Sequence, residues 1–270
     1  MKGAYPAAGS SRRSRERRRS EPASHVDGRR PRELSSRVRR RLVAWRPCCG
    51  GAGTVNKQAI IKSVLFGTGK EITAATSDIL PGYCRTGPYP YDPGKAKALL
   101  RAAGVKNLTI TLGSPQGRYP GDYQVTQAVA GYLRAVGITV QLPNPPDWPT
   151  YLNSLLDPPA TVPYSASLLG WSSTDISDQL ELYQAAYLPP HGYNFAWYQD
   201  AQVDQLIGQA NAQLNAKDRD HLYCQALKQI WTAAPFIFLY QNEFPVLARA
   251  GLKGIYMLPG EVVLTTYATN

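Results

Sequence analysis

Three short apolar segments, separated by helical patterns and recurring about every 30 residues, constrain the fold of this chain more than any other feature. They are residues 108–112, 138–142 and 165–169. In the first segment Leu108, Ile110 and Leu112 alternate with threonines, which is typical of a strand with one face in a core. A helix between successive strands indicates right-handed crossovers onto a largely parallel sheet. The sequence therefore predicts an α/β fold.

Helix starts are marked by side chains that can accept a hydrogen bond from first-turn amides. The predicted caps are Asn56, Asp92, Asp147 and Asp200, and further helices are expected from about Asp122 and about Lys217. After Pro235 the pattern changes to strands, expected at residues 236–240, 245–249, 255–258 and 262–267. These last strands have little of their own to pack on, so we expect them to complete the sheet of another domain.

Parallel strands end at one edge of a sheet, so the loops at residues 114–121 and 171–178 are expected to lie at the same edge. Ligands bind outside the carboxyl ends of such strands. The second loop carries an aromatic ring, hydroxyls and a carboxylate: Trp171, Ser172, Ser173, Thr174 and Asp175. We take it as the candidate binding loop. The alternative is an ordinary strand-to-helix connection, with Trp171 packed in the core and Asp178 capping the next helix.

The net positive charge of the chain comes entirely from its first fifth. Residues 1–50 hold 15 of the 30 Lys and Arg but only 4 of the 19 Asp and Glu, so they account for the whole net charge of +11. The rest gives no electrostatic reason to expect a polyanionic partner. Residues 1–53 are too poor in apolar side chains to form a core and are expected to be disordered. They are either a basic arm for nucleic acid or anionic lipid, or a non-native segment translated upstream or out of frame.

Cysteine, histidine and serine patterns indicate no catalytic or metal site. The four cysteines show neither zinc-ligand spacing nor a disulfide framework. No serine or cysteine has a recognisable nucleophile context, so we expect no enzyme and no cofactor. The chain also contains no apolar stretch of signal-peptide or transmembrane length, so neither an export signal nor a membrane anchor is predicted.

Local motifs then identify a family. They are KQAII at residues 57–61 with Gly67-Thr68-Gly69, PYPYDPGKA at 88–96, GRYPGD at 117–122, Leu169-Gly170-Trp171, VDQLI at 203–207, APFIFLYQ at 234–241 and GLKG at 251–254. In this order they resemble the second half of an extracytoplasmic solute-binding protein of the dipeptide, oligopeptide and nickel class of ABC importers. The resemblance covers about residues 57–270.

The resemblance implies a type II periplasmic-binding-protein fold, in which two α/β lobes close over a ligand. Residues 54–234 would form the second lobe, a mostly parallel sheet flanked by helices, and residues 235–270 the return segment to a first lobe missing from this chain. A truncated, monomeric receptor is thus expected. Its implied partners are a short peptide or similar solute and a membrane permease, without nucleic acid, and its implied location is periplasmic or extracytoplasmic.

The resemblance also implies which side chains contact the ligand. The acid after the Gly-Trp pair, here Asp175, would bind a peptide ammonium group. Many family members carry this acid one position earlier, where this chain has Thr174. Arg118 would face the acidic end of the ligand; otherwise it is a solvated loop charge. Trp171 would wall the pocket, and Tyr119 and Ser173 are further candidates.

Overall fold

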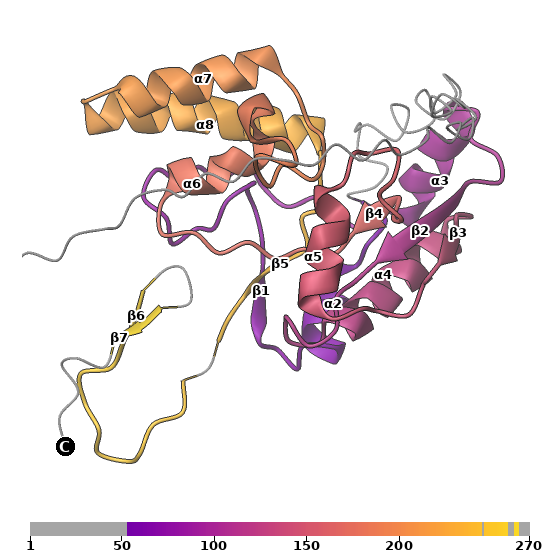
Figure 1. The fold of residues 1–270 in the computed structure, drawn as a ribbon, viewed down its shortest axis with the longest axis horizontal. Helices are drawn as coiled ribbons and strands as arrows, with labels where there is room; N and C mark the ends of the chain where they lie inside the picture. Colours follow the sequence, from indigo (N-terminus) through magenta and orange to yellow (C-terminus); the bar gives the residue numbers. More distant parts are fainter. Residues whose placement is uncertain (1–52, 245, 259–261, 265–270) are drawn as a thin grey trace, which may run out of the picture. The chain divides into compact units, whose positions relative to one another are not determined.

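The computed structural model describes residues 53–244, 246–258 and 262–264 (Figure 1). The expectation of disorder over residues 1–53 therefore lies outside the described residues, apart from Gly53. The Gly53 carbonyl accepts a hydrogen bond from the Asp92 amide at 2.8 Å, and Thr54 and Val55, which follow it, are buried. The first described residues are thus already part of the packed structure.

A parallel three-stranded sheet confirms the crossover prediction. β2 (Thr109–Gly113) lies between β3 (Thr139–Gln141) and β4 (Ala166–Ser167), and both neighbours run parallel to it. Ile110 is paired with Val140, and Leu112 with Ala166. Helix α4 (Asp122–Ala135) connects β2 to β3, and α5 (Trp148–Leu156) connects β3 to β4. Only two residues of the expected strand at 165–169 pair as β4.

The predicted helix caps are present in the structure. Asn56 accepts from Ala59 N at 2.9 Å, Asp92 from Lys95 N at 2.8 Å, Asp147 from Thr150 N at 3.0 Å and Asp200 from Gln202 N at 3.0 Å. These caps begin α2 (Lys57–Ser63), α3 (Pro93–Ala102), α5 and α7 (Ala201–Ala212), and α8 (Ala216–Ala233) packs along α7. One cap differs from expectation. Helix α6 (Ile176–Leu180) is capped by Asp175, whereas Asp178 supplies the amide that Asp175 accepts.

Two hydrophobic cores organise the described chain. The sheet core joins β2 and β3 to α2, α3 and α4, which Figure 1 shows around the sheet. Its most buried members include Ile60, Val125 and Leu133. The helical core joins α6, the 3-10 turn Glu181–Tyr183, α7 and α8, and centres on Leu180, Ile207, Leu227 and Ile230.

An antiparallel ribbon of β1 (Gly69–Glu71) and β5 (Tyr240–Asn242) was not expected, because the loop after α2 has no strand pattern. The strand predicted at residues 236–240 was wrong except at Tyr240. The strand predicted at 245–249 was also wrong, since residues 246–249 have no strand structure. Strands β6 (Tyr256–Leu258) and β7 (Val262–Leu264) do pair, antiparallel. The remainder of the last predicted strand, 265–267, lies outside the described residues.

A disulfide joins Cys84 to Cys224, which no spacing pattern in the sequence had indicated. It ties the loop between β1 and α3 to the middle of α8. None of the described helices is both long and apolar enough to cross a membrane.

Candidate functional site

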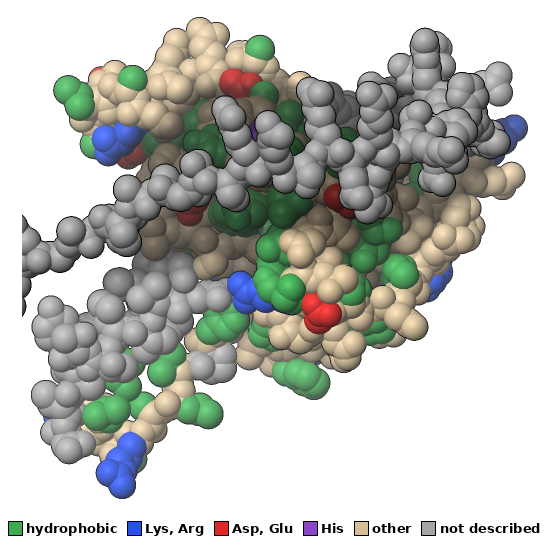
Figure 2. All heavy atoms as spheres, viewed as in Figure 1, with side chains coloured by type: hydrophobic (Ala, Val, Ile, Leu, Met, Phe, Trp, Pro, Cys, Tyr) green, Lys and Arg blue, Asp and Glu red, His purple; other side chains and the backbone are tan. Residues whose placement is uncertain are grey.

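A cavity of about 1620 Å³ lies along β2 and β4 and extends to the loop that follows β4. Its wall combines the loop after β4, part of the loop after β1, the turn at residues 193–198 and the chain at 233–244. Of the predicted site residues, Tyr119, Trp171 and Ser173 line it, and Arg118, Thr174 and Asp175 do not. On the face shown in Figure 2, the Lys and Arg side chains of the described residues lie apart and form no single basic patch.

Tyr119 brings the two predicted loops together. Its hydroxyl, at the carboxyl end of β2, donates to the Gly170 carbonyl at 3.1 Å, just after β4. A Cβ on Gly170 would lie 2.8 Å from the Tyr119 ring, so only glycine allows this close approach. The expectation that both loops lie at one edge of the sheet is therefore met. We call Arg118, Tyr119, Gly170 and Trp171 the rim.

Arg118 is exposed and rests on aromatic faces. Its guanidinium carbon lies 5.1 Å from the centre of the Tyr119 ring and 5.4 Å from that of Trp148, distances typical of cation–π contacts. No carboxylate of the described residues lies within ion-pair distance of it. These contacts hold the guanidinium beside the two rings, where its N–H donors can bind an anion.

Two further aromatic side chains, Trp148 and Tyr151, pack next to the rim. Trp148 packs edge-on against Tyr119 at 5.9 Å between ring centres and contacts Tyr151 at 6.2 Å. The fully buried Tyr151 donates its hydroxyl to the Leu168 carbonyl at 3.0 Å, and burial raises the pKa of this phenol well above its ordinary value. Tyr151 thus holds the end of β4 from one side as Tyr119 does from the other. The link of Tyr151 to the end of β4 has no local signal in the sequence.

Trp171 belongs to an aromatic group at the cavity. Its side chain is 37 % exposed, and its ring centre lies 5.1 Å from that of Tyr193, which in turn is 5.8 Å from Phe195. The core position considered for Trp171 is therefore not observed. Ser173 is buried, and its hydroxyl donates to the Gln179 side chain at 3.2 Å.

Asp175 is exposed and acts as a helix cap. Its Oδ1 atom accepts hydrogen bonds from the Ser177 hydroxyl at 2.6 Å and the Asp178 amide at 2.9 Å. These bonds hold the pKa of the Asp175 carboxyl below its usual value. Oδ1 accepts both of these bonds, so the exposed carboxylate can cap α6 and still accept a ligand donor through Oδ2. Thr174 is exposed beside it.

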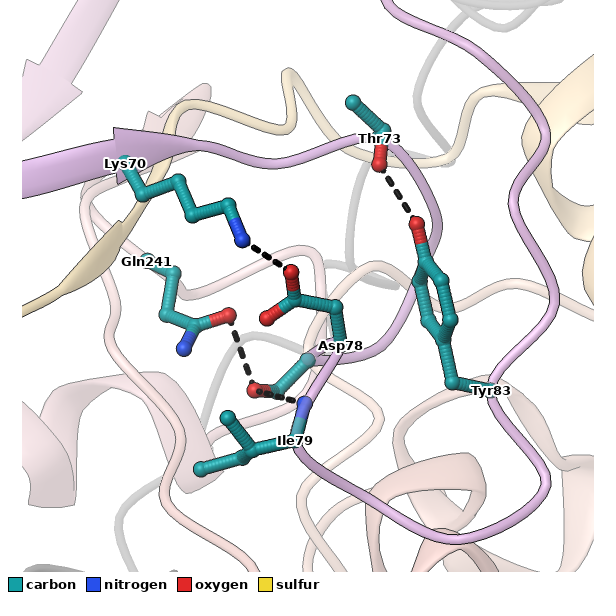
Figure 3. Close-up of polar contacts among 7 residues, drawn as sticks. Lys70, Thr73, Asp78, Ile79, Tyr83 and Gln241 are labelled. Carbon is teal, nitrogen blue, oxygen red and sulfur yellow. Dashed lines mark hydrogen bonds and ion pairs between the residues drawn. The ribbon is translucent and has the colours of Figure 1, made fainter.

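The opposite cavity wall is held by polar contacts that sequence reasoning missed. In Figure 3, the loop after β1 turns back onto the β1–β5 ribbon: Lys70 donates to Asp78, and the Ser77 hydroxyl donates to the Gln241 side chain at 2.8 Å. Ser77 and Gln241 are 164 positions apart, so no local pattern could pair them. Within the described part of the chain, no group of three or more His, Cys, Asp or Glu is arranged to hold a metal ion.

Comparison with known proteins identifies relatives along most of the chain. Residues 52–194 match the family model of bacterial extracellular solute-binding proteins, family 5 middle region. The glutathione-binding protein GsiB of Pectobacterium atrosepticum is 29 % identical over 209 residues, which are 76 % of this chain and 40 % of the relative. The oligopeptide-binding protein AppA of Bacillus subtilis is 25 % identical over 227 residues, 74 % of this chain and 39 % of the relative. The chain thus spans about two-fifths of the length of these relatives, which are binding proteins rather than enzymes.

Solved structures show the same fold. HbpA2 of Haemophilus parasuis superposes with a TM-score of 0.69 at 19 % identity, over 86 % of this chain and 45 % of that one. The periplasmic binding protein DppA of Helicobacter pylori, in complex with the peptide STSA, gives a TM-score of 0.63 at 23 % identity, over 72 % of this chain and 38 % of that one. The α/β architecture is therefore that of type II periplasmic binding proteins, as expected.

Proposed function

Because the chain belongs to the bacterial extracellular solute-binding proteins of family 5, we propose that it binds a short peptide or a similar small solute for an ABC importer. The observation that carries this proposal is the rim, where Tyr119 joins the ends of two parallel strands above a large cavity. Such an edge is the usual ligand position in open α/β sheets. The rim offers an arginine, Arg118, and the loop after β4 offers a carboxylate, Asp175; these are the two kinds of group that the ends of a peptide require.

In this proposal each charged side chain binds one end of the ligand. Asp175, kept ionised by its cap hydrogen bonds, would accept the ammonium group through Oδ2. Arg118 would donate to an acidic group from its stacked position. Trp171 and Tyr119 would wall the ligand, and the hydroxyls of Ser173 and Thr174 would bind its backbone.

The partners and location follow from the same proposal. Residues 54–234 would be the second lobe of the receptor and residues 235–270 its return segment, facing a first lobe and, outside the membrane, the permease of the importer. The chain would act as a monomer. The Cys84–Cys224 disulfide supports an oxidising, extracytoplasmic compartment. The alternative of a basic nucleic-acid-binding arm concerns residues outside the described part of the chain, and no observation favours it.

Substitutions at Asp175 test the proposal, because capping and ligand binding can be separated there. Asparagine is as good a helix cap as aspartate but has no charge. We expect Asp175→Asn to keep α6 stable and to weaken binding of the tetrapeptide Ser-Thr-Ser-Ala or of glutathione by roughly tenfold, the loss typical of one charge-assisted contact. Isothermal titration calorimetry measures the affinity, and circular dichroism the stability.

Two controls make the result decisive. Asp92→Asn changes a cap of the same kind on α3, away from the rim, and should leave affinity unchanged. Asp175→Ala should lose both the cap and the affinity. The proposal fails if the wild-type protein binds neither probe, or if Asp175→Asn binds both as tightly as the wild type does.

A further inference from the structure

Asp122 is a buried charge whose contacts extend beyond its own helix. It is the first residue of α4 and only 3 % exposed. Its Oδ2 atom accepts the backbone amides of Arg118 at 2.9 Å and Tyr119 at 3.2 Å, and its Oδ1 accepts that of Tyr123 at 2.8 Å. A first-turn acid stabilises a helix through its charge at the positive end of the helix dipole, without bonds to residues that precede the helix. The bonds to Arg118 and Tyr119 hold the loop that carries the rim.

The rim connects Asp122 to the binding loop on the other strand. Asp122 fixes the backbone at Tyr119, the Tyr119 hydroxyl fixes the carbonyl of Gly170, and Trp171 follows directly. The same two backbone bonds set where the Arg118 side chain leaves the loop, and so where its guanidinium stacks. The series consists of two hydrogen bonds and the peptide bond between Gly170 and Trp171.

We infer that Asp122 is the positioning residue of the rim: its buried carboxylate sets the loop at 117–121 and, through Tyr119, the position of Trp171 across the sheet edge. The ligand role of the rim rests on the proposed function, whereas the link from Asp122 to Trp171 does not. Asp122 itself touches no ligand in this inference. It preorganises the groups that do, which lowers the ordering cost of binding.

Nuclear magnetic resonance of the whole chain tests the link without a ligand. Asp122→Asn preserves side-chain volume but presents an amide N–H₂ in place of one acceptor oxygen. We expect faster exchange of the Arg118 and Tyr119 amides, by roughly tenfold or more, as hydrogen bonds to a charged acceptor are lost. We also expect a shift of the Trp171 indole N–H resonance, which Trp171→Phe assigns. Tyr119→Phe keeps the ring but removes the hydrogen bond to Gly170, so it should shift the Trp171 resonance and keep the Arg118 amide protected.

A control variant and two contrary outcomes complete the test. Asp92→Asn removes an exposed charge at the start of α3 and should leave the Trp171 resonance in place. If Asp122 serves only α4, its substitution alters exchange in the first turn of that helix and nothing at Trp171, and the inference is overturned. Should Asp122→Asn fail to fold, Tyr119→Phe decides, because an unmoved Trp171 resonance in that variant also overturns it.

Binding adds a second readout. With glutathione as the probe, Asp122→Asn should weaken affinity roughly tenfold, and adding Tyr119→Phe should cost little more, because both act through one link. Full additivity of the two losses would contradict that link. If the wild-type protein binds no probe, the proposed function fails, and the resonance of Trp171 alone decides the role of Asp122.

Discussion

The buried ammonium group of Lys57 is surrounded by aromatic rings and one carboxylate. Its side chain is 1 % exposed, and its Nζ lies 3.6 Å from Glu71 Oε1, 5.2 Å from the centre of the Tyr89 ring and 6.0 Å from that of Trp231. Burial lowers the pKa of Lys57, an effect that Glu71 only partly offsets. Glu71 is more exposed than Lys57 and also accepts from the Gln58 side chain at 2.8 Å. Lys57 and Glu71 therefore differ in burial and in the number of polar partners.

Substituting either partner of this pair should have unequal effects. Glu71→Gln leaves a buried cation unpaired and should lower the free energy of unfolding by about 3 kcal/mol, whereas Lys57→Met fills the same volume without charge and should cost at most about 1 kcal/mol. The double variant should regain most of what Glu71→Gln loses. Urea unfolding of the four proteins measures this cycle. Equal losses in the free energy of unfolding for the two single variants would contradict this prediction.

The lowered pKa of Lys57 also gives a pH dependence with a definite sign. The folded state releases the Lys57 proton at lower pH than the unfolded chain, whose lysine pKa is near 10.5. Between these two values the unfolded state binds more protons, so the Lys57 contribution to stability rises with pH. We expect the wild type to gain stability relative to Lys57→Met as pH rises from about 8 to about 10. A constant difference in the free energy of unfolding over this range would contradict it.

At the scale of elements, the disulfide connects parts that share no sheet. Cys84 lies in the loop after β1 and Cys224 within α8, 140 positions later. Closing a loop of this length stabilises the folded state by about 2–4 kcal/mol, mainly by restricting the unfolded chain. Cys84→Ser and Cys224→Ser should each lower the free energy of unfolding by that amount. Because either change removes the same bond, the double variant should lose no more than a single one. Additive losses in urea unfolding would contradict a shared bond.

Sequence reasoning predicted those elements whose signals are local. A cap such as Asp92 needs only the amide three residues later. In β2, the alternation of apolar and polar residues shows which side of the strand is buried. It missed the β1–β5 ribbon and the Ser77–Gln241 bond, because their partners are distant in sequence. At the site, the candidates Tyr119, Trp171 and Ser173 line the cavity, and their contact with a ligand stays a prediction. Asp175 caps α6, a role that the alternative interpretation of the loop gave to Asp178. A carboxylate can serve either an amide or a ligand, and residue type alone does not distinguish them.

At the scale of the whole molecule, the stretch at residues 236–240 links the two cores. Phe236 and Phe238 pack on the helical core, whereas Ile237, Leu239 and Tyr240 pack on the sheet core. The pattern that suggested a strand at 236–240 therefore has another cause, because alternate side chains of this segment pack on different cores. Only at Tyr240 does it become a strand, β5. A segment shared in this way should make the two cores unfold together.

Truncating Phe238 tests that coupling. Phe238 is 7 % exposed and stacks on Trp231 at 4.9 Å between ring centres, so Phe238→Ala should lower the free energy of unfolding by about 3 kcal/mol or more. Because the segment also holds Leu239 against the sheet core, the loss should appear equally in amides of the helical and the sheet core by native-state hydrogen exchange. Leu239→Ala is the matched control from the opposite side and should likewise affect both cores. If each substitution lowers protection only in the core that its own side chain enters, the cores unfold independently. The cavity wall at 233–244 would then be a flexible boundary between two separately stable cores, and a ligand at the rim would have to order that wall as it binds.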